Sequence, residues 1–107
     1  PQPGINPPPY EDSGPANGSL TIFTLAGDTI GRDNSPPSPL PETYCLIQTS
    51  NNKIFKVKSD DQGMIFMHDP AIKGPLNISC GAPECRYISY FGINAAYVAM
   101  PMIRLDP

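Results

Sequence analysis

The sequence predicts an all-β domain, a small antiparallel β-sandwich or barrel of six to eight short strands, that follows an extended Pro-rich N-terminal arm. Two observations support this fold class. Short runs of apolar and β-branched residues recur between turn residues at intervals of about 8–12 residues, and no run has the apolar spacing of a long helix. Ten of the 15 prolines lie within residues 1–41, so the two parts of the chain differ in what they can form.

The predicted arm spans residues 1–18. It contains six prolines and three glycines but few apolar side chains. This composition favours polyproline II and cannot supply a hydrophobic core. We therefore expect residues 19–107 to form the single β-domain.

The arm contains a short peptide with a known type of partner. Pro7, Pro8 and Pro9 precede Tyr10, and this pattern resembles the peptides that WW domains bind. The stretch PPPYED also resembles the budding motif of viral matrix proteins, although the resemblance covers six of the 107 residues. It implies a candidate binding segment at Pro7, Pro8, Pro9 and Tyr10.

The strands of the β-domain are predicted in order along the chain. Residues 20–25 form the first strand, and a turn separates it from a short strand at 29–30. Residues 33–41 form a long loop, because consecutive prolines disfavour regular pairing. The later strands are expected at residues 42–50, 53–59, 64–69, 76–80, 85–91 and 95–105.

Two prolines bear on these later strands. Pro70 is expected to end the strand at 64–69, and Pro101 predicts a bulge or an edge position in the last strand. Because the connections between most of these strands are short, we expect neighbouring strands to pair sequentially as a meander.

Three cysteines, Cys45, Cys80 and Cys85, allow three pairings, each of which leaves one thiol over. Cys80 and Cys85 flank a turn with Gly81 and Pro83, and they would face each other if the flanking segments pair, with Cα atoms about 4.5 Å apart. We therefore favour a Cys80–Cys85 disulfide and expect Cys45 to lie in the core in phase with Ile47. Pairing of Cys45 with one of the other two, or three reduced thiols, are the alternatives.

Charge and hydropathy exclude two classes of partner. The net charge is −3, and the basic residues form no stripe that could neutralise phosphates, so we expect no nucleic acid. The longest apolar stretch, residues 95–103, is nine residues long, so we expect no membrane span. Asn17 and Asn77 begin N-glycosylation sequons. Together with a disulfide, they indicate an extracellular, secreted protein.

Catalytic groups are scarce, so we expect no enzyme, no metal site and no cofactor. His68 is the one histidine, and adjacent strand residues point to opposite faces, so it is not expected to pair with Asp69. The spacing between Cys80 and Cys85 is not the usual spacing of zinc ligands.

The first hypothesis of function is therefore a small secreted, non-enzymatic protein that binds a host or cell-surface protein or glycan. Its general composition is similar to that of microbial effectors and cell-surface proteins, fungal ones especially. Tyr87 and Tyr90 differ in strand parity, so at least one faces outward, and both are candidate contact residues. The second hypothesis is a viral or intracellular protein that recruits WW-domain ligases through Pro7–Tyr10. The third is a small enzyme that uses His68.

Overall fold

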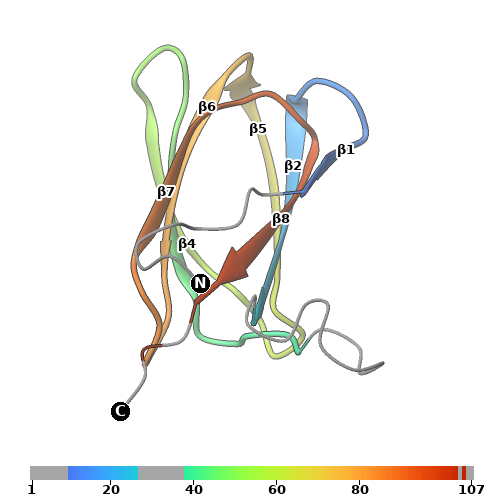
Figure 1. Cartoon of the computed structure of the whole chain (residues 1–107). Coiled ribbons are helices and arrows are strands. Elements are labelled where there is room, and N and C mark those ends of the chain that lie inside the picture. The colour runs from blue at the N-terminus through green and yellow to red at the C-terminus, as the bar shows by residue number, and fades with distance from the viewer. Residues whose placement is uncertain (1–9, 27–37, 104, 106–107) are drawn as a thin grey trace.

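The computed structural model describes residues 10–26, 38–103 and 105. Within these ranges the chain forms eight strands and no helix, and the strands make two four-stranded sheets (Figure 1). The predicted small β-sandwich is confirmed. The short strand expected at 29–30 and residues 1–9 of the proline-rich arm lie outside the described residues.

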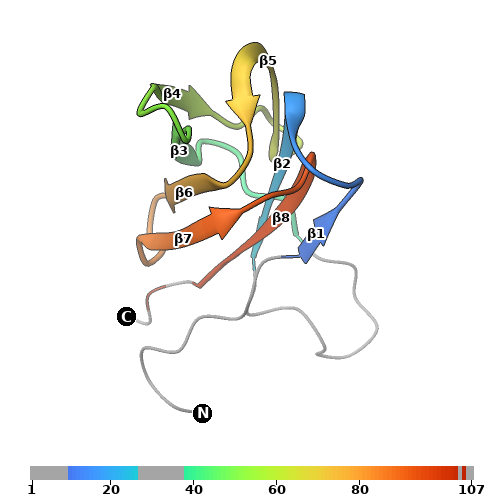
Figure 2. The same ribbon diagram turned by 90° about the horizontal axis from the view of Figure 1, so that it is seen from above.

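The first sheet has the strand order β1-β8-β2-β5. Strand β8 pairs antiparallel with β1 and parallel with β2, and β2 pairs antiparallel with β5. Figure 2 shows this sheet beside the second one. The bounds are Tyr10–Asp12 for β1, Asn17–Ala26 for β2, Met64–Lys73 for β5 and Tyr97–Met102 for β8.

The second sheet has the order β4-β3-β6-β7, and all its pairs are antiparallel. The bounds are Tyr44–Gln48 for β3, Ile54–Lys58 for β4, Leu76–Gly81 for β6 and Ile88–Ile93 for β7. Among the described strands, only β3–β4 and β6–β7 pair sequentially, so the expected meander is wrong. The chain changes sheet between β2 and β3, β4 and β5, β5 and β6, and β7 and β8, because each layer must bury its apolar face against the other.

Both prolines of interest are tolerated within strands. Strand β5 continues past Pro70, contrary to the prediction, because β5 lies at the edge of its sheet and its register with β2 slips there. Pro101 lies beyond Ala99, the last residue of β8 that pairs with β1. Strand β8 nevertheless lies between β1 and β2, and its register with β2 runs through Pro101 without a shift, so the predicted bulge or edge position is wrong. The proline is tolerated because its missing N–H interrupts no described pairing with β1.

A single core lies between the sheets and is built from the inward side of each strand. Strands β3 and β6 bury every second residue, as strand geometry requires. The fully buried larger side chains include Leu20, Ile22, Ile47, Ile72, Leu76, Ile78, Ile88, Val98, Met100 and Met102.

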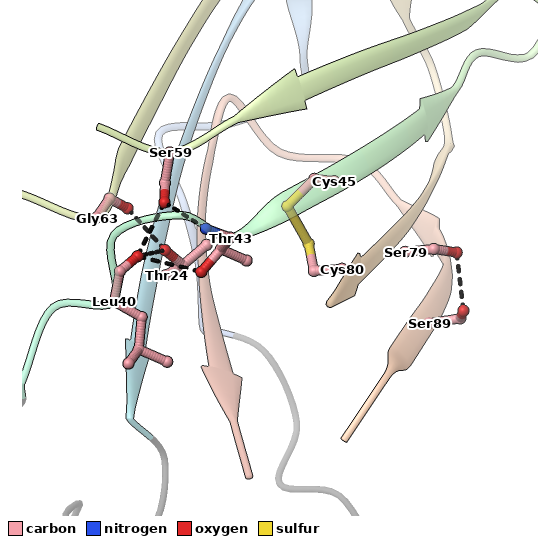
Figure 3. The surroundings of a disulfide bond; sticks show 9 residues. All are labelled: Thr24, Leu40, Thr43, Cys45, Ser59, Gly63, Ser79, Cys80 and Ser89. Atoms are coloured by element: carbon pink, nitrogen blue, oxygen red, sulfur yellow. Dashed lines mark hydrogen bonds between the residues drawn. A yellow bond between two sulfur atoms is a disulfide. The ribbon is translucent and has the colours of Figure 1, made fainter. Parts of the chain in front are cut away.

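The disulfide joins Cys45 to Cys80 within this core (Figure 3). The two residues face each other across β3 and β6, with Cα atoms 4.2 Å apart. The favoured Cys80–Cys85 pairing is wrong, because Cys80 lies opposite Ile88 and Cys85 falls in the loop between β6 and β7. Cys45 is buried as predicted, but as half of the disulfide, and Cys85 takes no part in it.

A buried polar cluster fixes the segment that leads into β3. The carbonyl oxygen of Leu40 accepts hydrogen bonds from the hydroxyls of Thr43 (3.1 Å) and Ser59 (2.8 Å), and the Thr24 hydroxyl lies 2.9 Å from it (Figure 3). The Gly63 carbonyl accepts from the backbone N–H of Thr24 at 2.8 Å. These contacts tie β2, the start of β3 and the β4–β5 turn together at one end of the sandwich.

Candidate functional site

The outer face of the β4-β3-β6-β7 sheet carries several large apolar side chains. Strand β3 alternates Tyr44 and Leu46, which point outward, with Cys45 and Ile47, which point into the core. Tyr44 is 61% exposed. Ile54 of β4, Phe91 of β7 and Tyr87 just before β7 are exposed as well. This concentration of exposed apolar side chains makes the face a candidate contact surface.

A groove of about 260 Å³ opens on this face. Its lining includes the side chains of Tyr44, Tyr87, Leu46 and Lys56, and the backbone of Gly81. The register explains how they meet, because Tyr44 lies opposite Gly81 of β6, and Leu46 lies opposite Lys56 of β4. The volume is close to the lower end of the range for small-molecule sites, about 300–1,000 Å³.

Gly81 makes room for one wall of the groove. A Cβ atom at this position would lie 2.8 Å from Cδ2 of Tyr87, so the tyrosine ring lies over the glycine. A ring from the β6–β7 loop thereby comes beside β3, where Tyr44 stands opposite Gly81. The groove thus has an aromatic ring from each of two segments distant in sequence.

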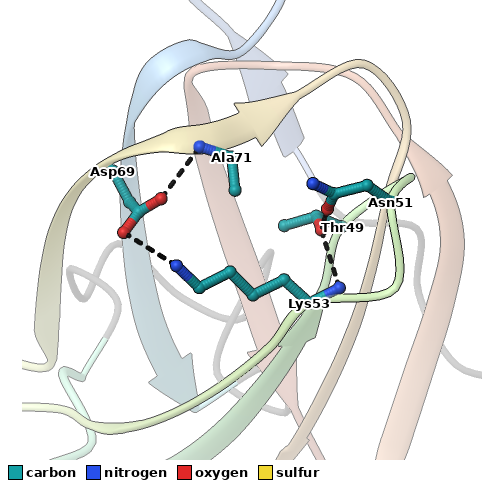
Figure 4. Close-up of polar contacts among 5 residues, drawn as sticks. All are labelled: Thr49, Asn51, Lys53, Asp69 and Ala71. Carbon is teal, nitrogen blue, oxygen red and sulfur yellow. Dashed lines mark hydrogen bonds and ion pairs between the residues drawn. The ribbon is translucent and has the colours of Figure 1, made fainter.

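The three lysines of this region have different electrostatic surroundings. Lys53 Nζ lies 3.4 Å from the Asp69 carboxylate (Figure 4), and Lys58 Nζ lies 3.9 Å from Glu42. Lys58 Nζ also lies 5.8 Å from the centre of the Tyr44 ring. Lys56, which lines the groove, has no ion pair within the described ranges. It is therefore the lysine of β4 whose charge the described acids leave unbalanced.

Hydrogen-bonding side chains continue from the groove across the same face. The hydroxyls of Ser79 and Ser89 lie 2.8 Å apart on β6 and β7 (Figure 3), and Ser79 is the register partner of Leu46. Farther along, the Asn77 amide nitrogen lies 3.5 Å from Gln48 Oε1. The face therefore combines aromatic rings with hydroxyl, amide and ammonium groups.

The two tyrosines named from the sequence have different environments. Tyr87 is 63% exposed and lines the groove. Tyr90 is half-buried and packs against the core, and this burial raises the pKa of its phenol above the usual value of 10.0. The sequence-based argument that at least one tyrosine faces outward applies to Tyr87.

The two sequon asparagines also differ in access. Asn17 is exposed at the start of β2. Asn77 is half-buried in β6, where its Oδ1 accepts a hydrogen bond from the backbone N–H of Gly92 at 3.2 Å. Asn17 is therefore the more accessible acceptor of the two.

The candidate WW-binding segment is described only at its last residue. Tyr10 is the first residue of β1, where its backbone lies opposite Ala99 of β8. Pro7, Pro8 and Pro9 lie outside the described residues. The groove lies on the outer face of the other sheet.

His68 lies on β5, away from the groove. Its Nδ1 is 3.0 Å from the hydroxyl of Ser19, which faces it across β2 and β5. The neighbouring Asp69 carboxylate instead accepts from the backbone N–H of Ala71 and pairs with Lys53 (Figure 4). These two contacts lower the pKa of the Asp69 carboxyl, and the hydrogen bond from Ala71 is the largest single cause. The side chains of His68 and Asp69 thus have different partners, as their strand parity predicts.

Sequence reasoning missed Tyr44, Leu46 and Lys56 as site residues. A signal was nonetheless present, because residues 44–47 are apolar at every position. In a sandwich, a strand can bury only one face against the opposite sheet. A strand with two apolar faces therefore exposes one of them, which makes that face a candidate contact surface.

Among the described residues, no three His, Cys, Asp or Glu side chains form a group that could hold a metal ion. The same part of the chain contains no helix with the length and apolar character needed to cross a bilayer. Comparison of the chain with protein-family models, with curated proteins and with solved structures gave no match.

Proposed function

We propose that this protein is an extracellular, non-enzymatic binding protein that recognises glycans through the groove between Tyr44 and Tyr87. The observation that carries the proposal is the pair of exposed aromatic rings lining one groove on a sheet face. A sugar ring has a face of polarised C–H groups, which is attracted to the negative π-face of an aromatic ring. Its hydroxyl edge needs hydrogen-bonding partners.

The surroundings of the groove offer such partners. Both tyrosines carry a phenolic hydroxyl, Lys56 carries three N–H donors, and Ser79 lies beside Leu46 in the register. The groove lining itself is mostly apolar, and a mostly apolar site that carries a few polar groups is typical of small-ligand sites. Because the groove is open and of small volume, we expect a dissociation constant of about 0.1–1 mM for a single site.

The disulfide supports an extracellular location. Disulfides persist in oxidising compartments and are rare in the cytosol, where thiols are kept reduced. Cys45 and Cys80 are both buried, and their strands are neighbours in the sheet that carries the groove. The proposed binding face therefore stands on a cross-linked sheet, which suits a small protein outside the cell.

Glycan binding can be tested with an array of oligosaccharides and three variants. Tyr44→Ala and Tyr87→Ala each remove one ring, and we expect each to weaken binding by about tenfold or more. Phe66→Ala is the matched control, because Phe66 is 65% exposed on β5 of the other sheet. The proposal fails if the protein binds no oligosaccharide, or if both tyrosine variants bind as tightly as the wild type.

A protein partner is the second candidate, and the extent of the apolar surface favours it. Ile54 is 59% exposed and Phe91 is 75% exposed, and neither lines the groove. A protein interface would use these outlying side chains as well as the tyrosines. Ile54→Ala and Phe91→Ala should then weaken capture of the partner, whereas glycan binding should tolerate both changes.

A further inference from the structure

We propose that the saccharide recognised by the groove is acidic, and that Lys56 binds its carboxylate or sulfate group. This inference rests on the proposed glycan-binding function and specifies the ligand class. It is argued from the charge on strand β4 and from the position of Lys56 in the groove.

The lysines of this region are unequally paired with acids. The carboxylates of Asp69 and Glu42 lie within 3.4 and 3.9 Å of the ammonium groups of Lys53 and Lys58. In the described part of the chain, no acid stands in the same relation to Lys56. An anionic group in the groove would supply the counter-charge that the protein leaves out.

Lys56 lies where a ligand in the groove could reach it. It lies opposite Leu46 in the register and shares the groove lining with Tyr44 and Tyr87. The methylene stem of a lysine packs on apolar neighbours, while its ammonium group remains at the surface. A ligand that stacks on a tyrosine ring would therefore meet the ammonium group at the side of the same groove.

The net charge of the protein affects how it could select an acidic ligand. The whole chain has a net charge of −3, so it does not attract anions at long range. Selection of an acidic sugar would thus depend on a short-range contact. Such a contact weakens as salt screens the exposed charges.

Protection of a sheet edge is the competing explanation. Strand β4 lies at the edge of its sheet, and edge lysines discourage pairing with other molecules. If Lys56 only protects the edge, neither Lys56→Gln nor Lys53→Gln should change the preference for an acidic saccharide. If Lys56 binds the acidic group, Lys56→Gln should remove that preference and Lys53→Gln should not.

The experiment measures binding of tetragalacturonate and of its fully methyl-esterified form by calorimetry at low salt. Wild-type protein should bind the acid form about tenfold more tightly than the ester. Lys56→Gln should bind the acid and ester forms about equally, and Lys56→Arg should restore the preference for the acid in part. Lys53→Gln is the matched control, because Lys53 pairs with Asp69 outside the groove. A sulfated oligosaccharide and its desulfated form repeat the comparison, to distinguish sulfate from carboxylate.

The outcomes separate this inference from the proposed function. Equal binding of acidic and neutral forms, or an unchanged preference in Lys56→Gln, would overturn the role of Lys56. If Tyr87→Ala still weakens binding in that case, glycan recognition stands without acid selectivity. Absence of binding to every saccharide would overturn both proposals. Circular dichroism of each variant checks that it has the wild-type fold.

Discussion

The ring of Tyr87 occupies the space that a side chain at Gly81 would fill. A Cβ atom there would lie 2.8 Å from Cδ2 and 3.2 Å from Cε2 of the ring. Because Tyr44 lies opposite Gly81 across β3 and β6, the glycine allows both rings to line one groove. The proposed binding site therefore depends on a residue that itself offers no side chain to a ligand.

Gly81→Ala tests this dependence. The added methyl group meets a partly exposed ring, which can move away, so we expect a stability loss of less than about 1 kcal/mol. The ring must leave its position, and we expect saccharide binding to weaken about as much as in Tyr87→Ala. Calorimetric titration and thermal unfolding measure the two effects. Unchanged binding would mean that the ring position over Gly81 does not matter to the ligand.

Gly63→Ala should lose stability and keep its ligand affinity, whereas Gly81→Ala should do the reverse. Gly63 has φ +75°, and a Cβ atom there would lie 2.5 Å from the backbone oxygen of Thr24 and 3.0 Å from the nitrogen of Leu40. Backbone atoms cannot yield as a surface ring can, so we expect a loss of about 3 kcal/mol or more. Urea unfolding measures it, and the ligand affinity of the folded fraction should not change.

Gly14→Ala is the control for the Gly63 variant. Gly14 has φ +68°, but no atom lies within 4 Å of its added Cβ. It should lose about 1 kcal/mol from the backbone conformation alone. If Gly63→Ala and Gly14→Ala lost equal stability, the backbone dihedral angle alone would explain the cost at Gly63, and the close packing around it would add nothing.

Reduction of the disulfide should destabilise the whole sandwich. Cys45 and Cys80 are 35 residues apart, and closing a loop of this length stabilises the fold by about 4 kcal/mol according to loop-closure entropy. We expect a large fall in melting temperature with reductant, and little change in Cys85→Ser. Alkylation of the unfolded, unreduced protein followed by peptide mapping should label Cys85 alone. Labelling of Cys45 would instead indicate the Cys80–Cys85 pairing.

The sequence predicted the class of the fold more accurately than its connections. Alternation within a strand is a local property, so the inward positions of Cys45 and Ile47 could be predicted. Which strands become neighbours depends on how the two layers cover each other. For that reason the pairing of β3 with β6 could not be predicted from adjacent segments.

The disulfide and the groove follow from that same pairing. Cys80 lies opposite Cys45 because β6 lies beside β3, and the pairing also brings Gly81 opposite Tyr44. Strand parity was enough to name Tyr87 as an exposed candidate. It could not name Tyr44 as the second ring of the groove, because the two tyrosines belong to segments distant in sequence. That Lys56 has no ion pair among the described residues likewise depends on where Asp69 and Glu42 lie in the fold.

The acid sensitivity of the fold should depend in part on Asp69. The hydrogen bond from the Ala71 N–H, which is the largest single cause, and the Lys53 ammonium group both lower the pKa of the Asp69 carboxyl from its usual value of 3.8 (Figure 4). A carboxyl with a lowered pKa in the folded state stabilises the fold above its unfolded-state pKa, and this contribution is lost as the pH falls below about 4. We therefore expect the urea midpoint of the wild type to fall more between pH 7 and pH 3 than that of Asp69→Asn.

Two further variants identify the source of this acid sensitivity. Lys53→Gln should remove a smaller part of it than Asp69→Asn, because the backbone hydrogen bond from Ala71 remains. Asp61→Asn, a change in the exposed β4–β5 turn, should leave the wild-type dependence intact. If Asp69→Asn loses as much stability on acidification as the wild type, other carboxylates are responsible. The hydrogen bond to Ala71 would then serve only to shape the bulge in β5, where the register with β2 slips.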